Sequence, residues 1–135
     1  MHTNLKHIFK SPFRNGRVFC FCLFLISTIS YAQPQLKFSE TKKSFGFVKK
    51  GELVTMEFDF TNTGNQPAII TEAKVECSCT TVEFPKQPIA PNQSAKVIVK
   101  FDTKSVYDRQ DRIVEIMSNA KNSAQKIRFK GVVLK

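Results

Sequence analysis

The sequence lacks several residue types on which common functions depend. It has no tryptophan, and its only two histidines, His2 and His7, lie at the very start of the chain. Histidine is the commonest general base and the usual partner of a serine or cysteine nucleophile, so the rest of the chain has no such pair. None of the five glycines belongs to a phosphate-binding loop. These absences argue against an enzyme.

The sequence also lacks an apolar run long enough to span a membrane. Its longest run, residues 18–29, has 12 residues, whereas a spanning helix needs roughly 18. Basic residues without acids precede the run, and Ser30-Tyr31-Ala32 follows it with small residues at the −3 and −1 positions of a cleavage site. We therefore predict that residues 1–32 form a cleaved signal peptide. The protein would be exported to the periplasm or beyond, with no membrane span after cleavage.

Cleavage would leave residues 33–135, a chain of 103 residues with 17 Lys and Arg against 11 acids and a net charge of +6. This length suits one domain with a single core. The positive charge could attract polyanions of the cell envelope, but the basic residues are scattered along the sequence. We expect an ordinary solvated basic surface, no nucleic acid, and a partner that is another envelope or secreted protein.

Apolar and polar residues alternate through most of residues 33–135, which is the period of β-strands. The pattern predicts about seven short strands and no long helix. It favours an all-β fold, an immunoglobulin-like two-sheet antiparallel sandwich, over the alternative of a small closed barrel. We expect the alternate positions that oppose the charged residues to face inward and form a buried core, which would consist of Phe58, Phe60, Val97, Val99, Phe101, Ile116 and Phe129.

Cys77 and Cys79 are the two cysteines that would survive cleavage, and they share one parity with Ile69 and Val75. Three interpretations stay open: small buried hydrophobes, a redox pair or disulfide, and thiolate ligands for copper(I) or zinc. Two residues of extended strand would separate their Cα atoms by about 6.6–6.8 Å, at the limit for a disulfide. Serine at position 78 bends less readily than glycine, so the geometry favours two free thiols.

Several ordered segments together resemble a known bacterial family. They include Phe45-Gly46-Phe47-Val48, residues 58–64, Cys77-Ser78-Cys79-Thr80, Pro88-Ile89-Ala90-Pro91 and residues 97–103. This combination is similar to domain of unknown function fifteen seventy-three. The resemblance implies an immunoglobulin-like domain, akin to the ciliary and sperm-protein type that serve as assembly modules, in an exported protein with no established reaction.

Two departures from the family pattern concern turns. Asn92 follows Pro91 where glycine is usual, and asparagine tolerates the left-handed conformation better than most residues. Residues 107–112 lack the glycine expected in their turn.

Two functions follow from the sequence. The first is a non-catalytic structural or protein-interaction module of the cell envelope without a cofactor. The alternative is a periplasmic thiol-redox or copper-binding protein that uses Cys77 and Cys79, with these two residues as the metal ligands.

Overall fold

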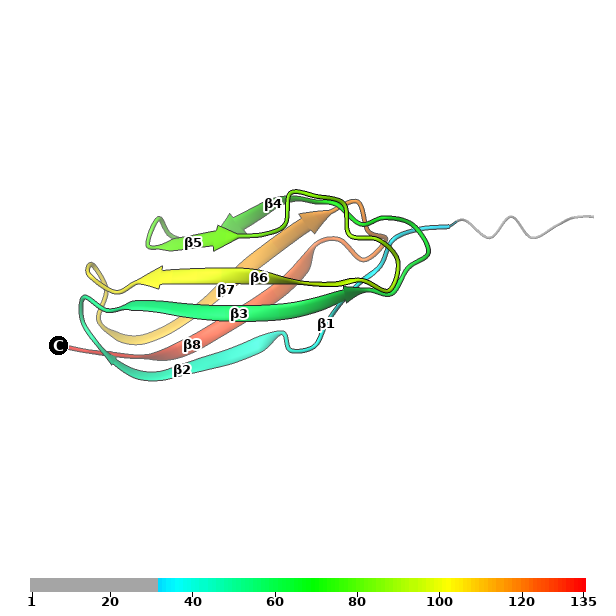
Figure 1. The fold of residues 1–135 in the computed structure, drawn as a ribbon. Coiled ribbons are helices and arrows are strands. Elements are labelled where there is room, and N and C mark those ends of the chain that lie inside the picture. The colour runs from blue at the N-terminus through cyan, green and yellow to red at the C-terminus, as the bar shows by residue number, and fades with distance from the viewer. Residues whose placement is uncertain (1–31) are drawn as a thin grey trace, which may run out of the picture. The chain divides into compact units, whose positions relative to one another are not determined.

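The computed structural model describes residues 32–135, and the predicted signal peptide lies outside them except for Ala32. The described residues form eight strands (Figure 1). These are β1 (Leu36–Phe38), β2 (Lys42–Lys49), β3 (Leu53–Asn62), β4 (Ile70–Val75), β5 (Thr80–Glu83), β6 (Ser94–Asp102), β7 (Asp108–Ser118) and β8 (Gln125–Leu134). No helix in this part of the chain is long and apolar enough to cross a membrane.

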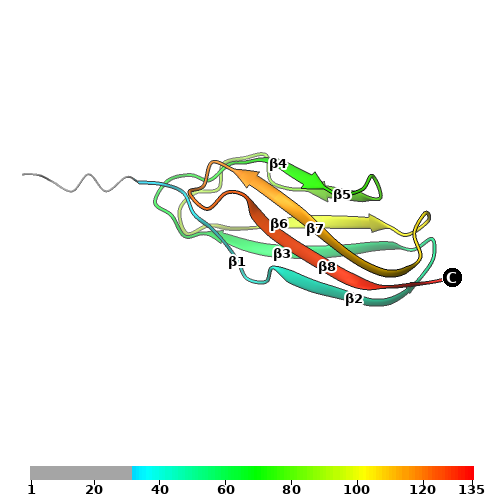
Figure 2. The same ribbon diagram turned by 180° about the vertical axis from the view of Figure 1, so that it is seen from behind.

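The strands form two four-stranded sheets, in the orders β1-β3-β6-β5 and β2-β8-β7-β4. Figures 1 and 2 show the two sheets stacked face to face, so the sandwich is confirmed and the barrel is not. β2 pairs with β8 in parallel, which corrects the prediction of wholly antiparallel sheets. The strand that the sequence missed is β5, because Pro85 and Pro88 directly after it suggested a loop or edge passage. β5 is an edge strand.

The core lies between the sheets, and the seven residues predicted to be buried are all inaccessible to solvent. Aromatic rings join the two layers at its centre. The ring of Phe101 on β6 lies 5.3 Å from that of Phe129 on β8 and 5.7 Å from that of Phe45 on β2. The alternate positions predicted to face inward were therefore the correct core residues, because the alternation of side-chain direction along a strand is a local property of the chain.

A β-bulge in β2 reverses the direction of its side chains. Ser44 pairs with Lys130 and Gly46 with Gly131, so Phe45 is an extra residue on the β2 side. Phe45 consequently packs into the core, while Phe47, two residues later, is 76% exposed. A regular strand would have placed both rings on the same face. Gly131 is required here, because a Cβ atom at this position would overlap the ring of Phe45.

A second irregularity corrects the predicted face of β4. The sequence placed Ile69, Val75 and the cysteines on one inward face, but Ile70 is the buried residue and Ile69 is 39% exposed. The register shifts between Ile70 and Glu72, which adds one residue and reverses the parity at the start of the strand.

Two loops take left-handed backbone conformations without glycine. Asn92 has φ of 64°, as its place after Pro91 led us to expect. Asp108, in the segment that lacks the expected glycine, has φ of 65°. Aspartate and asparagine are the non-glycine residues that adopt this conformation most readily. Asp108 thus supplies the turn geometry at the start of β7.

Asn62 ties three chain segments together inside the sandwich. Its side-chain amide donates to the carbonyl oxygens of Gln66 and Ile89 at 2.7 and 2.9 Å. Its side-chain oxygen accepts from the backbone N–H groups of Gln35 and Gly64 at 3.3 and 3.0 Å. The residue is fully buried, and all four of its side-chain hydrogen-bonding positions are used. It fixes the loops at the end of the sandwich opposite the β2–β3 turn (Figure 1).

Candidate functional site

Cys77 and Cys79 lie in the turn between β4 and β5 and not on a strand. β4 ends at Val75, and the backbone N–H of Thr80 donates to the carbonyl of Cys77 at 3.2 Å, which closes a tight turn around Ser78. The two Cα atoms are 5.2 Å apart, and a disulfide joins the sulfurs. The prediction of two free thiols on an extended strand is therefore wrong. The turn brings the Cα atoms into the range that a disulfide needs.

The disulfide affects the prediction that Cys77 and Cys79 bind a metal ion as thiolates. In this form neither Cys77 nor Cys79 is a free thiolate. Among residues 32–135, no three His, Cys, Asp or Glu side chains gather as a possible metal-ligand group. Metal binding by the two cysteines remains a prediction for the reduced protein, and so does a redox role. Both sulfurs lie on half-buried residues at the crossover from one sheet to the other.

We expect the Cys77→Ser/Cys79→Ser double variant to lose only about 1–2 kcal/mol of unfolding free energy, because so short a loop restricts the unfolded chain little. Denaturant unfolding of the purified protein measures this loss, with Ser78→Ala as the control in the same turn. A loss above about 4 kcal/mol would show instead that the disulfide holds the β4–β5 crossover together.

Apolar side chains gather on the outer face of the β2-β8-β7-β4 sheet, at the end where β8 finishes. Phe47, Tyr107 and Leu134 are 76%, 56% and 45% exposed. Tyr107, Val132 and Leu134 line one shallow hollow, and Phe47 is the cross-strand neighbour of Val132. We refer to these four residues as the apolar patch. Large exposed apolar groups that cluster in this way commonly mark an interaction site.

A second hollow, of about 360 Å³, lies beside the apolar patch on the same sheet. Lysine and arginine side chains dominate its lining, which consists of Lys42, Lys43, Ser44, Arg109, Asp111, Arg128 and Lys130. We call it the basic hollow. β2, β7 and β8 all contribute to it, and Figure 2 views the sheet from the side of this outer face.

Asp111 is the one acid that lines the basic hollow, and Arg128 neutralises it. The Nε of Arg128 donates to Oδ1 of Asp111 at 2.6 Å, and a second hydrogen bond joins Nη2 to Oδ2. These hydrogen bonds from Arg128 lower the pKa of the Asp111 carboxyl from its usual value, so it stays ionised and paired. The cations that remain are Lys42, Lys43, Arg109 and Lys130.

Salt bridges pair lysines on the outer faces of both sheets. On the β1-β3-β6-β5 sheet Lys96 pairs with Glu57 at 2.7 Å, and Lys100 pairs with Glu83. On the β2-β8-β7-β4 sheet Lys126 pairs with Glu115 at 3.1 Å. By contrast, no acidic side chain within residues 32–135 forms a salt bridge with Lys42, Arg109 or Lys130. The basic residues are scattered along the sequence, but the pairing of β2, β8 and β7 brings Lys42, Arg109 and Lys130 together on one face.

Sequence reasoning missed both surface features for identifiable reasons. The exposure of Phe47 depends on the bulge at Phe45, and the only local signal for that bulge is the glycine between the two phenylalanines. The basic hollow depends on the pairing of β2 with β8, strands at opposite ends of the domain sequence. No spacing within one segment indicates that pairing.

Eight short strands in two stacked sheets, with the first two strands divided between the sheets, define an immunoglobulin-like β-sandwich domain. The chain belongs to the family described as "Protein of unknown function (DUF1573)", which matches residues 36–133. This result confirms the resemblance seen in the sequence. No curated protein matches.

Solved structures support the same fold at low identity. A protein of unknown function from Porphyromonas gingivalis W83 is 16% identical, with a TM-score of 0.68 over 80% of this chain and 51% of that one. The ASH/PapD-like domain 7 of human CEP192 is 8% identical, with a TM-score of 0.60 over 100% of this chain and 99% of that domain. Vibrio cholerae VesB protease is 16% identical, with a TM-score of 0.56 over 76% of this chain and 32% of the protease.

These likenesses show the fold alone. This chain spans 51% of the Porphyromonas gingivalis protein and 32% of the protease, so each of those proteins contains much that has no counterpart here.

Proposed function

We propose that the chain is an exported, non-catalytic protein-interaction module of the bacterial cell envelope, and that it binds its partner through the apolar patch. The observation that carries the proposal is the 76% exposure of Phe47 on a strand whose other aromatic residue, Phe45, packs into the core. Export is supported by the signal-peptide pattern of residues 1–32.

The patch holds three of the six large apolar side chains that are exposed among residues 32–135. Its members come from β2, β8 and the connection before β7, and they converge on one side of the molecule. Aromatic residues such as Phe47 and Tyr107 are enriched at the centres of protein interfaces, where burial of a large ring contributes most of the affinity. The patch therefore offers two aromatic anchors to a partner.

The partner would dock on side chains and not add a strand to the sheet. β2 is an edge strand, and among the described residues it pairs only with β8. However, lysines stand at positions 42, 43 and 49, and a bulge interrupts its pairing at Phe45. Edge lysines and bulges are the devices by which sheets discourage strand addition. Phe47 follows the bulge and projects from the face of the sheet.

The rim of the patch indicates the charge of the partner. Lys50 and Lys135 place their ammonium groups 5.9 and 5.6 Å from the centre of the Tyr107 ring. Lys49 is the strand neighbour of Leu134, and Arg109 is that of Val132. A protein with an apolar protrusion bordered by acidic residues complements this arrangement in both shape and charge.

Affinity measurement tests the proposal. A complex isolated from envelope extract with the tagged protein identifies the partner, and the purified pair is then titrated. Phe47→Asp should weaken binding about tenfold or more, as expected at an interface anchor. Ile69→Asp is the matched control, because Ile69 is 39% exposed but lies next to Asn119, beyond the end of β7 that is remote from the patch. It should change the Kd by no more than about twofold. Equal losses in both variants would place the interface elsewhere.

A further inference from the structure

The basic hollow presents more positive charge than its surroundings balance. Its cations come from three strands: Lys42 on β2, Arg109 on β7, and Arg128 and Lys130 on β8. Lys42 pairs across the sheet with Arg128, and Ser44 pairs with Lys130, so these side chains share the outer face. Such a concentration of like charge is unfavourable in the free protein, and a bound anion would relieve it.

The lining residues differ in how much they contribute to the net positive charge of the basic hollow. The Asp111–Arg128 pair is neutral as a unit. The ammonium group of Lys43 lies 3.6 Å from Glu40 and 5.6 Å from the centre of the Phe58 ring, which directs it toward the rim of the sandwich. Among the cations that line the hollow, those without a salt bridge to the described residues are therefore Lys42, Arg109 and Lys130. A hydroxyl adds to these cations: Ser44 Oγ accepts from the N–H of Gly46 at 3.3 Å, and its own O–H can still donate.

The size of the hollow restricts the ligand. Three cations around about 360 Å³ favour a small ligand that carries several negative charges. A phosphoryl group carries about −1.5 to −2 charges at neutral pH, whereas a carboxylate carries one. The guanidinium of Arg109 suits two oxygens of one phosphoryl group, and lysines bind phosphate as point charges.

From this geometry we infer that the basic hollow is a binding site for a phosphate-bearing anion, with Lys42, Arg109 and Lys130 as its cationic contacts and Ser44 as a hydroxyl donor. The inference goes beyond the proposed protein interaction and does not depend on it. A free polyphosphate and the headgroup of an anionic phospholipid both present this chemistry.

Calorimetric titration of the purified protein with tripolyphosphate is the first measurement, and cosedimentation with vesicles of phosphatidylcholine and phosphatidylglycerol is the second. For whichever of the two probes binds the parent protein, the Lys42→Glu/Lys130→Glu variant should show an affinity at least roughly tenfold lower. Lys37→Glu/Lys121→Glu makes the same change of net charge away from the hollow, on β1 and in the β7–β8 connection, and should bind nearly as the parent does. Unchanged thermal unfolding of all variants establishes that the fold is intact.

The two probes separate the sources of the ligand. Tripolyphosphate binding that shows this variant pattern supports a free phosphate ligand, and vesicle binding alone with the same pattern supports a lipid headgroup. If neither probe binds, or if the control variant loses as much affinity as the hollow variant, the site is refuted. Pentaglutamate tests whether a ligand with several carboxylates binds as well as one with phosphates. If pentaglutamate binds as tightly as tripolyphosphate, the inference is also overturned. Lys42→Gln/Lys130→Gln, which removes charge without reversing it, should give an intermediate loss.

Discussion

Replacing Phe101 with alanine should lower the free energy of unfolding by about 3–5 kcal/mol, the largest effect that we expect from a single substitution. Phe101 is fully buried and lies at the contact between the sheets, with the rings of Phe45 and Phe129 from the opposite sheet packed against it. Alanine would leave a cavity that two rigid sheets cannot close, because each sheet is fixed by its own hydrogen bonds.

Denaturant unfolding measures this effect. Phe47→Ala is the matched control: it removes the same ring from an exposed position, and it should change stability by no more than about 0.5 kcal/mol. A loss below about 1 kcal/mol in Phe101→Ala would mean that the centre of the core is assigned wrongly.

The second large effect should come from Asn62→Ala, which we expect to cost about 2–4 kcal/mol. The substitution leaves the carbonyl oxygens of Gln66 and Ile89, and the N–H groups of Gln35 and Gly64, without their side-chain partner. An unsatisfied buried polar group costs about 1–3 kcal/mol. The total falls short of four such penalties because several of these groups lie where water can reach them after local rearrangement.

Asn65→Ala provides the comparison for Asn62. Asn65 is exposed in the same loop, so its replacement should leave stability within about 0.5 kcal/mol of the parent. Native-state hydrogen exchange adds a second readout: Asn62→Ala should speed the exchange of the Gly64 amide. If both variants unfold at the same denaturant concentration as the parent, Asn62 does not tie these loops together.

The regular parts of the fold could be predicted from the sequence. Phe58 and Phe60 face inward because β3 is an unbroken strand, and its alternation reads directly from the residues. The same holds for Val97, Val99 and Phe101 on β6. Asn92 could be predicted as well, since its left-handed conformation follows from a local preference of the residue.

The irregular parts could not be predicted. The bulge at Phe45 depends on the close approach of its ring to Gly131, a residue 86 positions away. The reversal at Ile70 depends on the register of β4 against β7, and the Cys77–Cys79 turn depends on the passage of the chain from one sheet to the other. These features are set by tertiary contacts, and single-residue patterns do not contain that information.

The same reasoning applies to the candidate surface. Phe47, Lys42, Arg109 and Lys130 are unremarkable within their own segments, and the sequence predicted no role for them. Their proximity comes from the parallel pairing of β2 with β8 and the antiparallel pairing of β8 with β7. The cysteine pair, which drew attention in the sequence, lies at the opposite edge of the sandwich, beyond β7 and β4.

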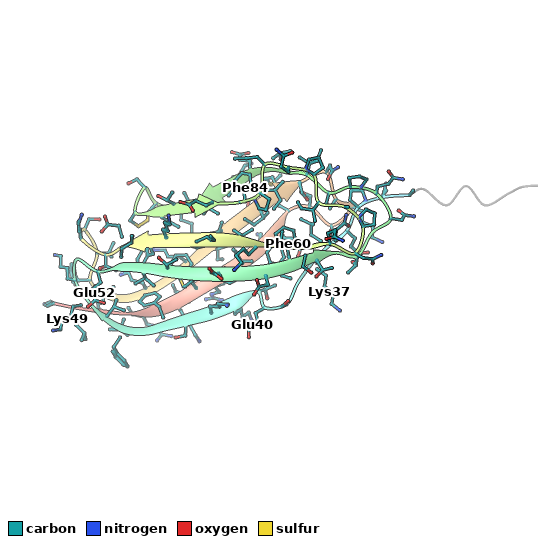
Figure 3. The ribbon with its side chains drawn as sticks, in the orientation of Figure 1. Lys37, Glu40, Lys49, Glu52, Phe60 and Phe84 are labelled. Carbon is teal, nitrogen blue, oxygen red and sulfur yellow. A yellow bond between two sulfur atoms is a disulfide. The ribbon has the colours of Figure 1, made fainter. Side chains whose placement is uncertain are left out.

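The central claim is that the outer face near β2 and the end of β8 is the surface that binds a partner protein. Hydrogen–deuterium exchange of the complex against the free protein tests it most directly. Lys49 and Glu52, labelled in Figure 3, mark the β2–β3 end of the sandwich where this surface lies. The account predicts slower exchange on binding in β2 and in the second half of β8, and no change in β1, β5 and β6. Slower exchange confined to the β1-β3-β6-β5 sheet, with β2 and β8 unaffected, would contradict it.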